Sequence, residues 1–218
     1  MYVLYGGGVT RSLGPQMMLE EGDIPYELRI VDDAKNEHQT AEYLTLNPAG
    51  FIPALQLPNG DVLHEAAAIM VYLAENHNLQ NLMPTLGDPL RGLFFCKLFY
   101  QTNDVQPPIC RFFRPERYST NPDHVADIRQ SARDTAMDRW AVLDSFLAKN
   151  GPYHLGDRFS LLDLHMTLWA AYGLEKPTTV INAFPAVRHC FELTTKRPKV
   201  GPLITALQKK IAAWDTAS

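Results

Sequence analysis

Apolar and polar residues alternate with two different periods in the first part of the chain. Residues 2–5 and 26–31 have the period of strands, whereas 13–21 and 65–75 have the spacing of helices. Gly22 follows the first of these helices and can adopt the left-handed conformation that ends many helices. These runs predict strands and helices in alternation.

A polar segment with several helix formers, 37–46, and a hairpin complete this part of the chain. The turn sequence PNGD at 58–61 separates two short strands, 54–57 and 62–63. The resulting order, β-α-β-α-β-β-α, predicts a small mixed sheet with helices on its faces.

From about residue 90 the pattern is helical only. Apolar residues recur at Ala136, Trp140, Leu143 and Leu147, as on one face of a helix, and 161–172 is apolar almost all round, as in a buried helix. In the segment that precedes residue 90, 77–89, the residues Asn, Pro, Gly and Asp are frequent. We therefore predict an α+β protein with a mixed domain at 1–77, a linker at 78–89 and an all-helical domain at 90–218.

Composition narrows the classes of partner. With a formal net charge of -4, the chain has no global positive field to attract nucleic acid or an anionic membrane. Cys96, Cys110 and Cys190 have no metal-binding or disulfide-framework spacing, which favours a reducing compartment and no metal site. No apolar run approaches the roughly 18 residues of a membrane span, and no export signal is recognisable. We expect a cytoplasmic protein whose partner is a small molecule or another protein.

Two spaced motifs carry a family resemblance. Residues 47–55 read NPAGFIPAL, and ten residues later 65–73 read EAAAIMVYL. Together they resemble the N-P-x-G-x-[VI]-P-x-L and E-S-x-A-I-x-x-Y-L motifs of the glutathione S-transferase superfamily. MMLEE at 17–21 and GDRFSLLD at 156–163 extend the likeness over essentially the whole chain. The resemblance implies a thioredoxin-like first domain, glutathione as co-substrate and a homodimer.

The resemblance also implies binding residues for glutathione. It implies a cis bond before Pro53, next to Phe51, which would leave the backbone of Ile52 free to pair with the peptide. Taken alone, the same stretch is equally well a simple turn with a strand-edge proline. Phe51 is also less polar than the residue in many relatives.

Glu65 and Ala66 would open a helix whose first N–H groups bind the glutamyl carboxylate, with Glu65 facing the glutamyl ammonium. Glu65 is otherwise an ordinary helix-start acid. The chain departs from the family motif at Ala66, where a serine usually adds a hydroxyl, and we expect weaker glutathione binding unless Thr10 or water compensates.

The loop between the first strand and the first helix reads GGGVTR at 6–11. It lacks the lysine of a P-loop and the spacing of a dinucleotide fingerprint, so we do not predict a nucleotide site. In the superfamily this loop delivers the residue that contacts the sulfur. Of Tyr5, Thr10, Arg11 and Ser12, the last aligns best with the family's serine and is our catalytic candidate, with Arg11 helping to lower the thiol pKa. A plain helix cap is the alternative role for Ser12, and Thr10 stays open as the sulfur contact.

Three residues outside this domain complete the predictions. Asp104 is a candidate for the glutamyl ammonium of glutathione in the partner subunit, as acidic residues in this helix are in some classes. Ser160 and Asp163 have the form of a capping box, to which we assign a structural role.

The function expected is that of a glutathione transferase acting on a small hydrophobic electrophile, as in detoxification. No cysteine lies in the first loop, which argues against mixed-disulfide exchange with glutathione. The alternatives are a glutathione-dependent isomerase, dehalogenase or etherase, and a non-enzymatic interaction module of the same fold, which Ala66 favours.

Overall fold

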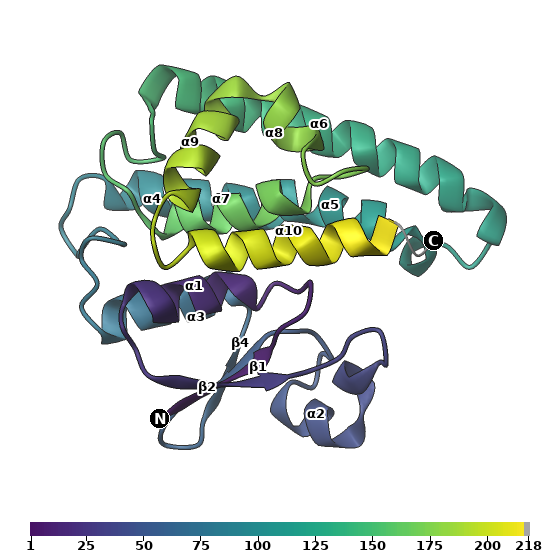
Figure 1. Ribbon diagram of the computed structural model, residues 1–218, viewed down its shortest axis with the longest axis horizontal. Helices are drawn as coiled ribbons and strands as arrows, with labels where there is room; N and C mark the ends of the chain where they lie inside the picture. Colours follow the sequence, from purple (N-terminus) through teal and green to yellow (C-terminus); the bar gives the residue numbers. More distant parts are fainter. Residues whose placement is uncertain (216–218) are drawn as a thin grey trace. The chain divides into compact units, whose positions relative to one another are not determined.

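A computed structural model describes residues 1–215 of the chain, which separate into two compact units (Figure 1). The first unit contains residues 1–83 together with the described residues 196–215. The second unit is Pro84–Thr195. The change of unit between Met83 and Pro84 falls inside the segment 78–89 for which a linker is predicted.

The first unit is built on a four-stranded sheet in the order β2-β1-β3-β4. β1 pairs with β2 in parallel and with β3 antiparallel, and β3 pairs antiparallel with β4. Its elements are β1 (Tyr2–Gly6), α1 (Leu13–Glu21), β2 (Tyr26–Ile30), the short 3-10 helix η1 (Glu37–Gln39), α2 (Ala41–Leu46), β3 (Ala54–Gln56), β4 (Val62–His64), α3 (Ala66–Asn76) and α10 (Gly201–Asp215). This is the thioredoxin-like arrangement expected, so the α+β class is confirmed.

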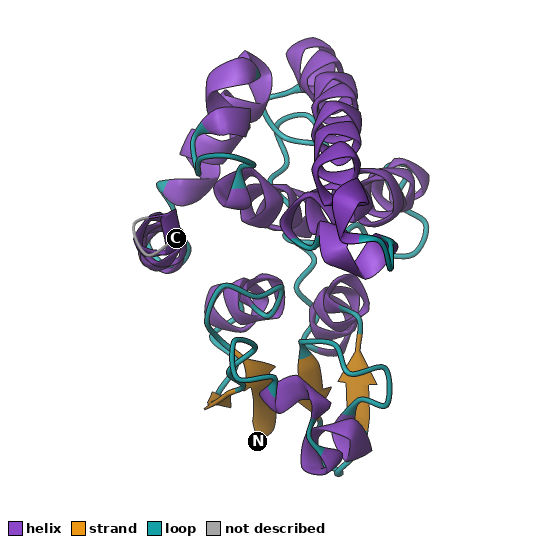
Figure 2. Ribbon diagram, turned by 90° about the vertical axis from the view of Figure 1, so that its right-hand side faces the viewer, coloured by secondary structure: helices purple, strands orange, loops and turns teal. Residues whose placement is uncertain are grey.

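Helices cover both faces of this sheet, as Figure 2 shows. α1 and α3 lie side by side on one face, over the buried side chains of Tyr2 and Leu4. On the other face, Tyr43 of α2 is buried in a cluster with Ile52 and Ala54, against which Tyr5 packs. The alternation of Tyr2, Leu4 and Tyr5 between the two faces follows from the two-residue period of a strand.

The end of α1 differs from the sequence prediction. Gly22 has a φ of -84°, and the left-handed residue is Asp23, with a φ of 51°. A Cβ on Gly22 would lie 2.9 Å from the Ile24 side chain and 3.0 Å from that of Leu79. The φ of Gly22 is one that any residue adopts, so the backbone conformation does not require glycine at this position.

The second unit is entirely helical in the regular elements that the structure describes. These are α4 (Arg91–Tyr100), the π-helical turn η2 (Gln101–Val105), α5 (Gln106–Phe113), the 3-10 helices η3 (Pro115–Tyr118) and η4 (Pro122–His124), α6 (Val125–Asn150), α7 (Leu161–Tyr172), α8 (Thr179–Ala183) and α9 (Pro185–Thr195). α7 is buried along nearly its whole length, as its apolar sequence predicts. Within residues 1–215, no helix has both the length and the apolar composition to cross a membrane.

Candidate functional site

Strand register brings three loop segments together at one end of the sheet. Tyr5 of β1 lies opposite Ala54 of β3, and Ala54 in turn lies opposite His64 of β4. The loop after Gly6, the segment 51–53 before β3 and the residues after His64 therefore leave the sheet at the same end. All but one of the candidate binding residues, the exception being Asp104, lie on these three segments.

The segment 51–53 has the predicted backbone. The peptide bond between Ile52 and Pro53 is cis, as predicted. The Ile52 side chain is buried, and neither the N–H nor the C=O of this residue has a hydrogen-bond partner among residues 1–213, whose side chains are described. Two adjacent backbone groups at the end of a strand are thus left for another peptide to pair with.

The carbonyl oxygen before Ile52 is held in place by two donors. The Tyr43 hydroxyl donates to the Phe51 carbonyl at 2.8 Å, and Asn47 Nδ2 donates to the same oxygen at 2.6 Å. Burial raises the pKa of Tyr43 to about 12, so this hydroxyl stays protonated and keeps donating at any physiological pH. Asn47 belongs to the N-P-x-G motif, whereas nothing in the sequence around Tyr43 marks it as part of this site.

Glu65 connects β4 to α3 in an unusual conformation. Its φ of 69° and ψ of 110° are rare for a residue with a side chain. Such strain tends to occur at functional sites, where the surrounding structure maintains it. The Glu65 side chain is exposed and makes no capping hydrogen bond, so the N–H groups of Ala66 and Ala67 open α3 without an intrahelical acceptor.

The loop from Gly7 to Ser12 is closed by its own hydrogen bonds. Ser12 Oγ accepts from the Gly7 N–H at 2.8 Å and lies 2.7 Å from Thr10 Oγ1, which donates to the Gly7 carbonyl at 2.7 Å. Thr10 and Ser12 are both buried. Ser12 occupies the N-cap position of α1 but has helical dihedral angles and caps no N–H of that helix. The plain-cap alternative for Ser12 does not describe this geometry.

The three glycines before this network have separate roles. Position 6 has no room for a side chain, because a Cβ on Gly6 would lie 2.1 Å from Ser12 Cβ. Gly7 and Gly8 have φ values of 92° and 65°, which side chains disfavour, and the space beside Gly8 is open. A nucleotide-binding role is not needed to explain any of them.

Arg11 and Phe51 connect the first loop to the segment 51–53. The Arg11 guanidinium carbon lies 5.5 Å from the centre of the Phe51 ring, a cation–π contact. Phe51 is 48% exposed although it is a large apolar residue. The last of the sulfur-contact candidates, Tyr5, is occupied elsewhere, because its hydroxyl accepts from Arg29 Nη1 at 3.0 Å.

Asp104 lies in the second unit, on the π-helical turn η2. It is half-buried, and its Oδ1 lies 3.8 Å from Arg139 Nε. Its predicted contact with glutathione of a partner subunit stays a prediction.

A buried polar cluster also lies in the second unit, around Asp163. Asp163 Oδ2 accepts from the Ser160 N–H at 2.8 Å, which confirms the predicted capping box of α7. Asp163 Oδ1 accepts from His154 Nδ1 at 2.8 Å and from Cys190 Sγ at 3.4 Å. These three side chains have metal-binding chemistry, but burial raises the pKa of the Cys190 thiol far above its usual range, and the hydrogen bonds already occupy the carboxylate. The cluster is therefore a structural element of α7.

Known proteins resemble this chain in sequence. Residues 11–76 match the family model described as the glutathione S-transferase N-terminal domain. The chain is 30% identical over 210 residues to a glutathione S-transferase-like protein, OpS6, of Beauveria bassiana, covering 92% of this chain and 89% of that protein. It is 26% identical over 170 residues to maleylacetoacetate isomerase of Pseudomonas aeruginosa, with 74% of each chain covered.

A solved structure resembles the whole chain. It is a glutathione transferase homologue from Sulfitobacter with bound glutathione, with a TM-score of 0.85 and 26% identity, covering 94% of this chain and 98% of the other.

Proposed function

Because the chain belongs to the glutathione S-transferase superfamily, we propose that it binds glutathione along the segment 51–53 and uses the thiol on a small hydrophobic electrophile. The observation that carries the proposal is the unpaired backbone of Ile52 at the end of β3. Its N–H and C=O would pair with the cysteinyl residue of glutathione in the manner of an added strand. The bound glutathione of the Sulfitobacter homologue supports the same ligand.

The glutamyl end of glutathione would extend toward Glu65. Since Pro53 and Glu65 leave paired strands at the same end, one tripeptide can reach both. The free N–H groups of Ala66 and Ala67 and the positive end of α3 would bind the glutamyl carboxylate. The exposed carboxylate of Glu65 would neutralise the neighbouring ammonium group.

The cysteinyl thiol would then lie against the loop Gly7–Ser12. In the proposed reaction the thiol loses its proton to solvent, and the thiolate forms a carbon–sulfur bond with the electrophile. Either a leaving group departs with the bonding electrons or the addition product takes up a proton. Removal of reactive electrophiles would be a detoxifying role.

A glutathione-dependent isomerase is the second candidate, favoured by the likeness to maleylacetoacetate isomerase. The two reactions differ in what happens to glutathione, because an isomerase returns it unchanged and a transferase consumes it. Thiol titration during turnover, with maleylacetoacetate and with a panel of electrophiles, separates them. The homodimer and the cytoplasmic location stay predictions.

The first test is calorimetric titration with glutathione. We expect binding in the millimolar range or tighter, and Ala66→Ser should tighten it about ten-fold or more, since a hydrogen bond to a charged group contributes about 1.5–3 kcal/mol. Ala68→Ser, on an exposed position of the same helix, is the matched control and should leave the affinity unchanged. Absence of binding at millimolar glutathione would refute the proposal.

A further inference from the structure

The hydroxyl proton of Ser12 is already used within the loop. A hydroxyl has a single proton to donate. Thr10 donates its proton to the Gly7 carbonyl, so in the 2.7 Å contact between the two hydroxyls Thr10 is the acceptor and Ser12 the donor. Ser12 Oγ also accepts from the Gly7 N–H. Ser12 thus has no proton left for a sulfur.

Turning Ser12 toward a ligand would disrupt this loop. The side chain is 1% exposed and packs so closely on Gly6 that no Cβ fits between them. Rotation would leave the Gly7 N–H without its acceptor and break the bond to Thr10. Each buried polar group left without a partner costs about 1–3 kcal/mol. The loop geometry therefore opposes a direct contact between Ser12 and a thiolate.

Arg11 is the charged group that the same loop presents. Arg11 is half-buried, and among residues 1–213, whose side chains are described, no ion pair joins its guanidinium to a carboxylate. It lies over the ring of Phe51, whose backbone directly precedes the free groups of Ile52. Burial raises the pKa of Tyr43, and the positive charge of Arg11 acts in the opposite direction on the same hydroxyl, which donates to the Phe51 carbonyl. A guanidinium keeps its charge and offers five donors at any physiological pH.

We infer that Arg11 is the residue that stabilises the thiolate of bound glutathione, and that Ser12 is a positioning residue that holds the loop carrying it. This inference rests on the proposed function, because it places the sulfur beside the segment 51–53. It departs from the sequence prediction, in which the Ser12 hydroxyl contacts the sulfur. Arg11 becomes the main group that stabilises the thiolate, whereas the sequence prediction has it only assist Ser12 in lowering the thiol pKa.

The test measures the thiol pKa of glutathione in the complex, from the ultraviolet absorbance of the thiolate, and glutathione affinity separately by calorimetry. Arg11→Met removes the charge and keeps the stem, and the thiol pKa should rise toward the value of about 8.5 of a free thiol. Arg11→Lys keeps the charge and should retain most of the shift. At a pH below the thiol pKa, each unit by which that pKa rises lowers the thiolate fraction by about ten-fold.

Ser12→Ala should leave the thiol pKa at the wild-type value while speeding hydrogen exchange of the Gly7 amide, because that amide loses its acceptor. If this variant does not fold, Thr10→Val tests the same loop. It frees the Ser12 proton, and the thiol pKa should again stay unchanged.

An unchanged thiol pKa in Arg11→Met overturns the inference. So does a thiol pKa that rises in Ser12→Ala as much as in Arg11→Met, or one that falls in Thr10→Val. Wild-type protein that binds glutathione without any shift of the thiol pKa also overturns it and leaves glutathione binding intact. Absence of binding heat in the wild type overturns the proposed function, and this inference with it.

Discussion

Gly6 shows how one residue sets the shape of the candidate site. It is the last residue of β1, and the Ser12 side chain occupies the place of its missing Cβ, with Ser12 Oγ 2.4 Å from that position. We predict that Gly6→Ala destabilises the protein by about 1–3 kcal/mol, the usual range for overpacking, and weakens glutathione binding because the loop must move. Urea unfolding and calorimetry measure the two effects.

Gly92 on α4 is the matched control for Gly6. A Cβ there meets no atom within 4 Å, and the helical backbone favours alanine. Gly92→Ala should raise the free energy of unfolding by about 0.5–1 kcal/mol and leave binding unchanged. Equal stability of the two variants would contradict the role given to Gly6.

Among the elements, α7 depends on one buried carboxylate. Asp163 is fully buried and accepts hydrogen bonds from the backbone N–H groups of His154 and Ser160 and from the His154 ring. The ring continues the network, since its Nε2 accepts from Gln101 Nε2 at 3.1 Å. Removing the carboxylate therefore leaves several buried donors without an acceptor, which costs more than the loss of a helix cap alone.

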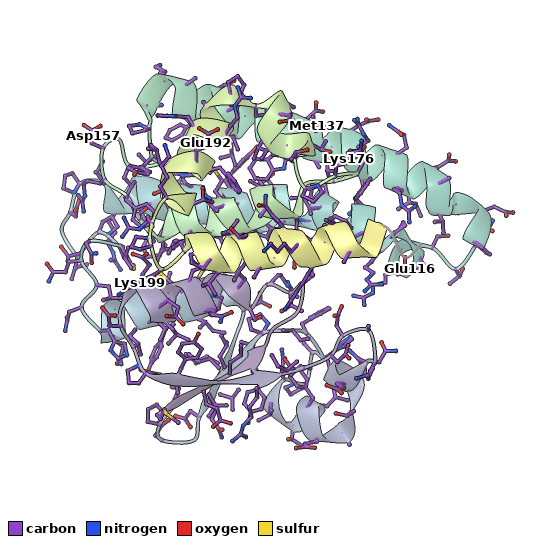
Figure 3. The ribbon with its side chains drawn as sticks, viewed as in Figure 1. Glu116, Met137, Asp157, Lys176, Glu192 and Lys199 are labelled. Carbon is purple, nitrogen blue, oxygen red and sulfur yellow. The ribbon has the colours of Figure 1, made fainter. Side chains whose placement is uncertain are left out.

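We predict that Asp163→Ala lowers the free energy of unfolding by about 2–4 kcal/mol, against the roughly 1 kcal/mol of a simple cap. Asp157, labelled in Figure 3, is an exposed carboxylate on the loop just ahead of α7. Asp157→Ala should change the stability by less than about 0.5 kcal/mol. A loss of only about 1 kcal/mol in Asp163→Ala, measured by urea unfolding, would mean that the network adds nothing to the cap.

Local elements were predictable from the sequence where the pattern was strong. The bounds of α1 and α7 follow from their apolar spacing and from Gly22 and Ser160 at their ends. The sequence points to Gly22 for the left-handed residue, because glycine adopts that conformation at the lowest cost, whereas in the structure Asp23 adopts it. The internal bonding of Ser12 was missed for a related reason. A serine at a helix start has the same local pattern whether it caps, binds a ligand or, as here, closes a loop.

At the scale of the whole molecule, the C-terminal helix is where chain order and spatial grouping differ. By sequence α10 follows the helical domain, but the structure groups it with the first unit. Arg197 Nη2 lies 2.5 Å from Glu21 Oε2 at the end of α1, and Lys199, labelled in Figure 3, pairs with Asp23 at 2.5 Å. Ile204, Leu207 and Ile211 bury one face of α10, at helical spacing. We infer that α10 is stabilised together with the thioredoxin-like sheet.

This assignment predicts which helices loosen when α10 is weakened. Ile204→Ala should lower stability by about 2–5 kcal/mol, as for other buried large-to-small changes, and hydrogen exchange should rise in α1 and α3. Thr205→Ala, at the exposed neighbouring position, should change neither quantity. If hydrogen exchange rises in α6 and α7 instead, α10 belongs with the helical domain, in agreement with the range 90–218 predicted for that domain from the sequence. Because the same variant has opposite outcomes under the two groupings, exchange measured by mass spectrometry decides between them.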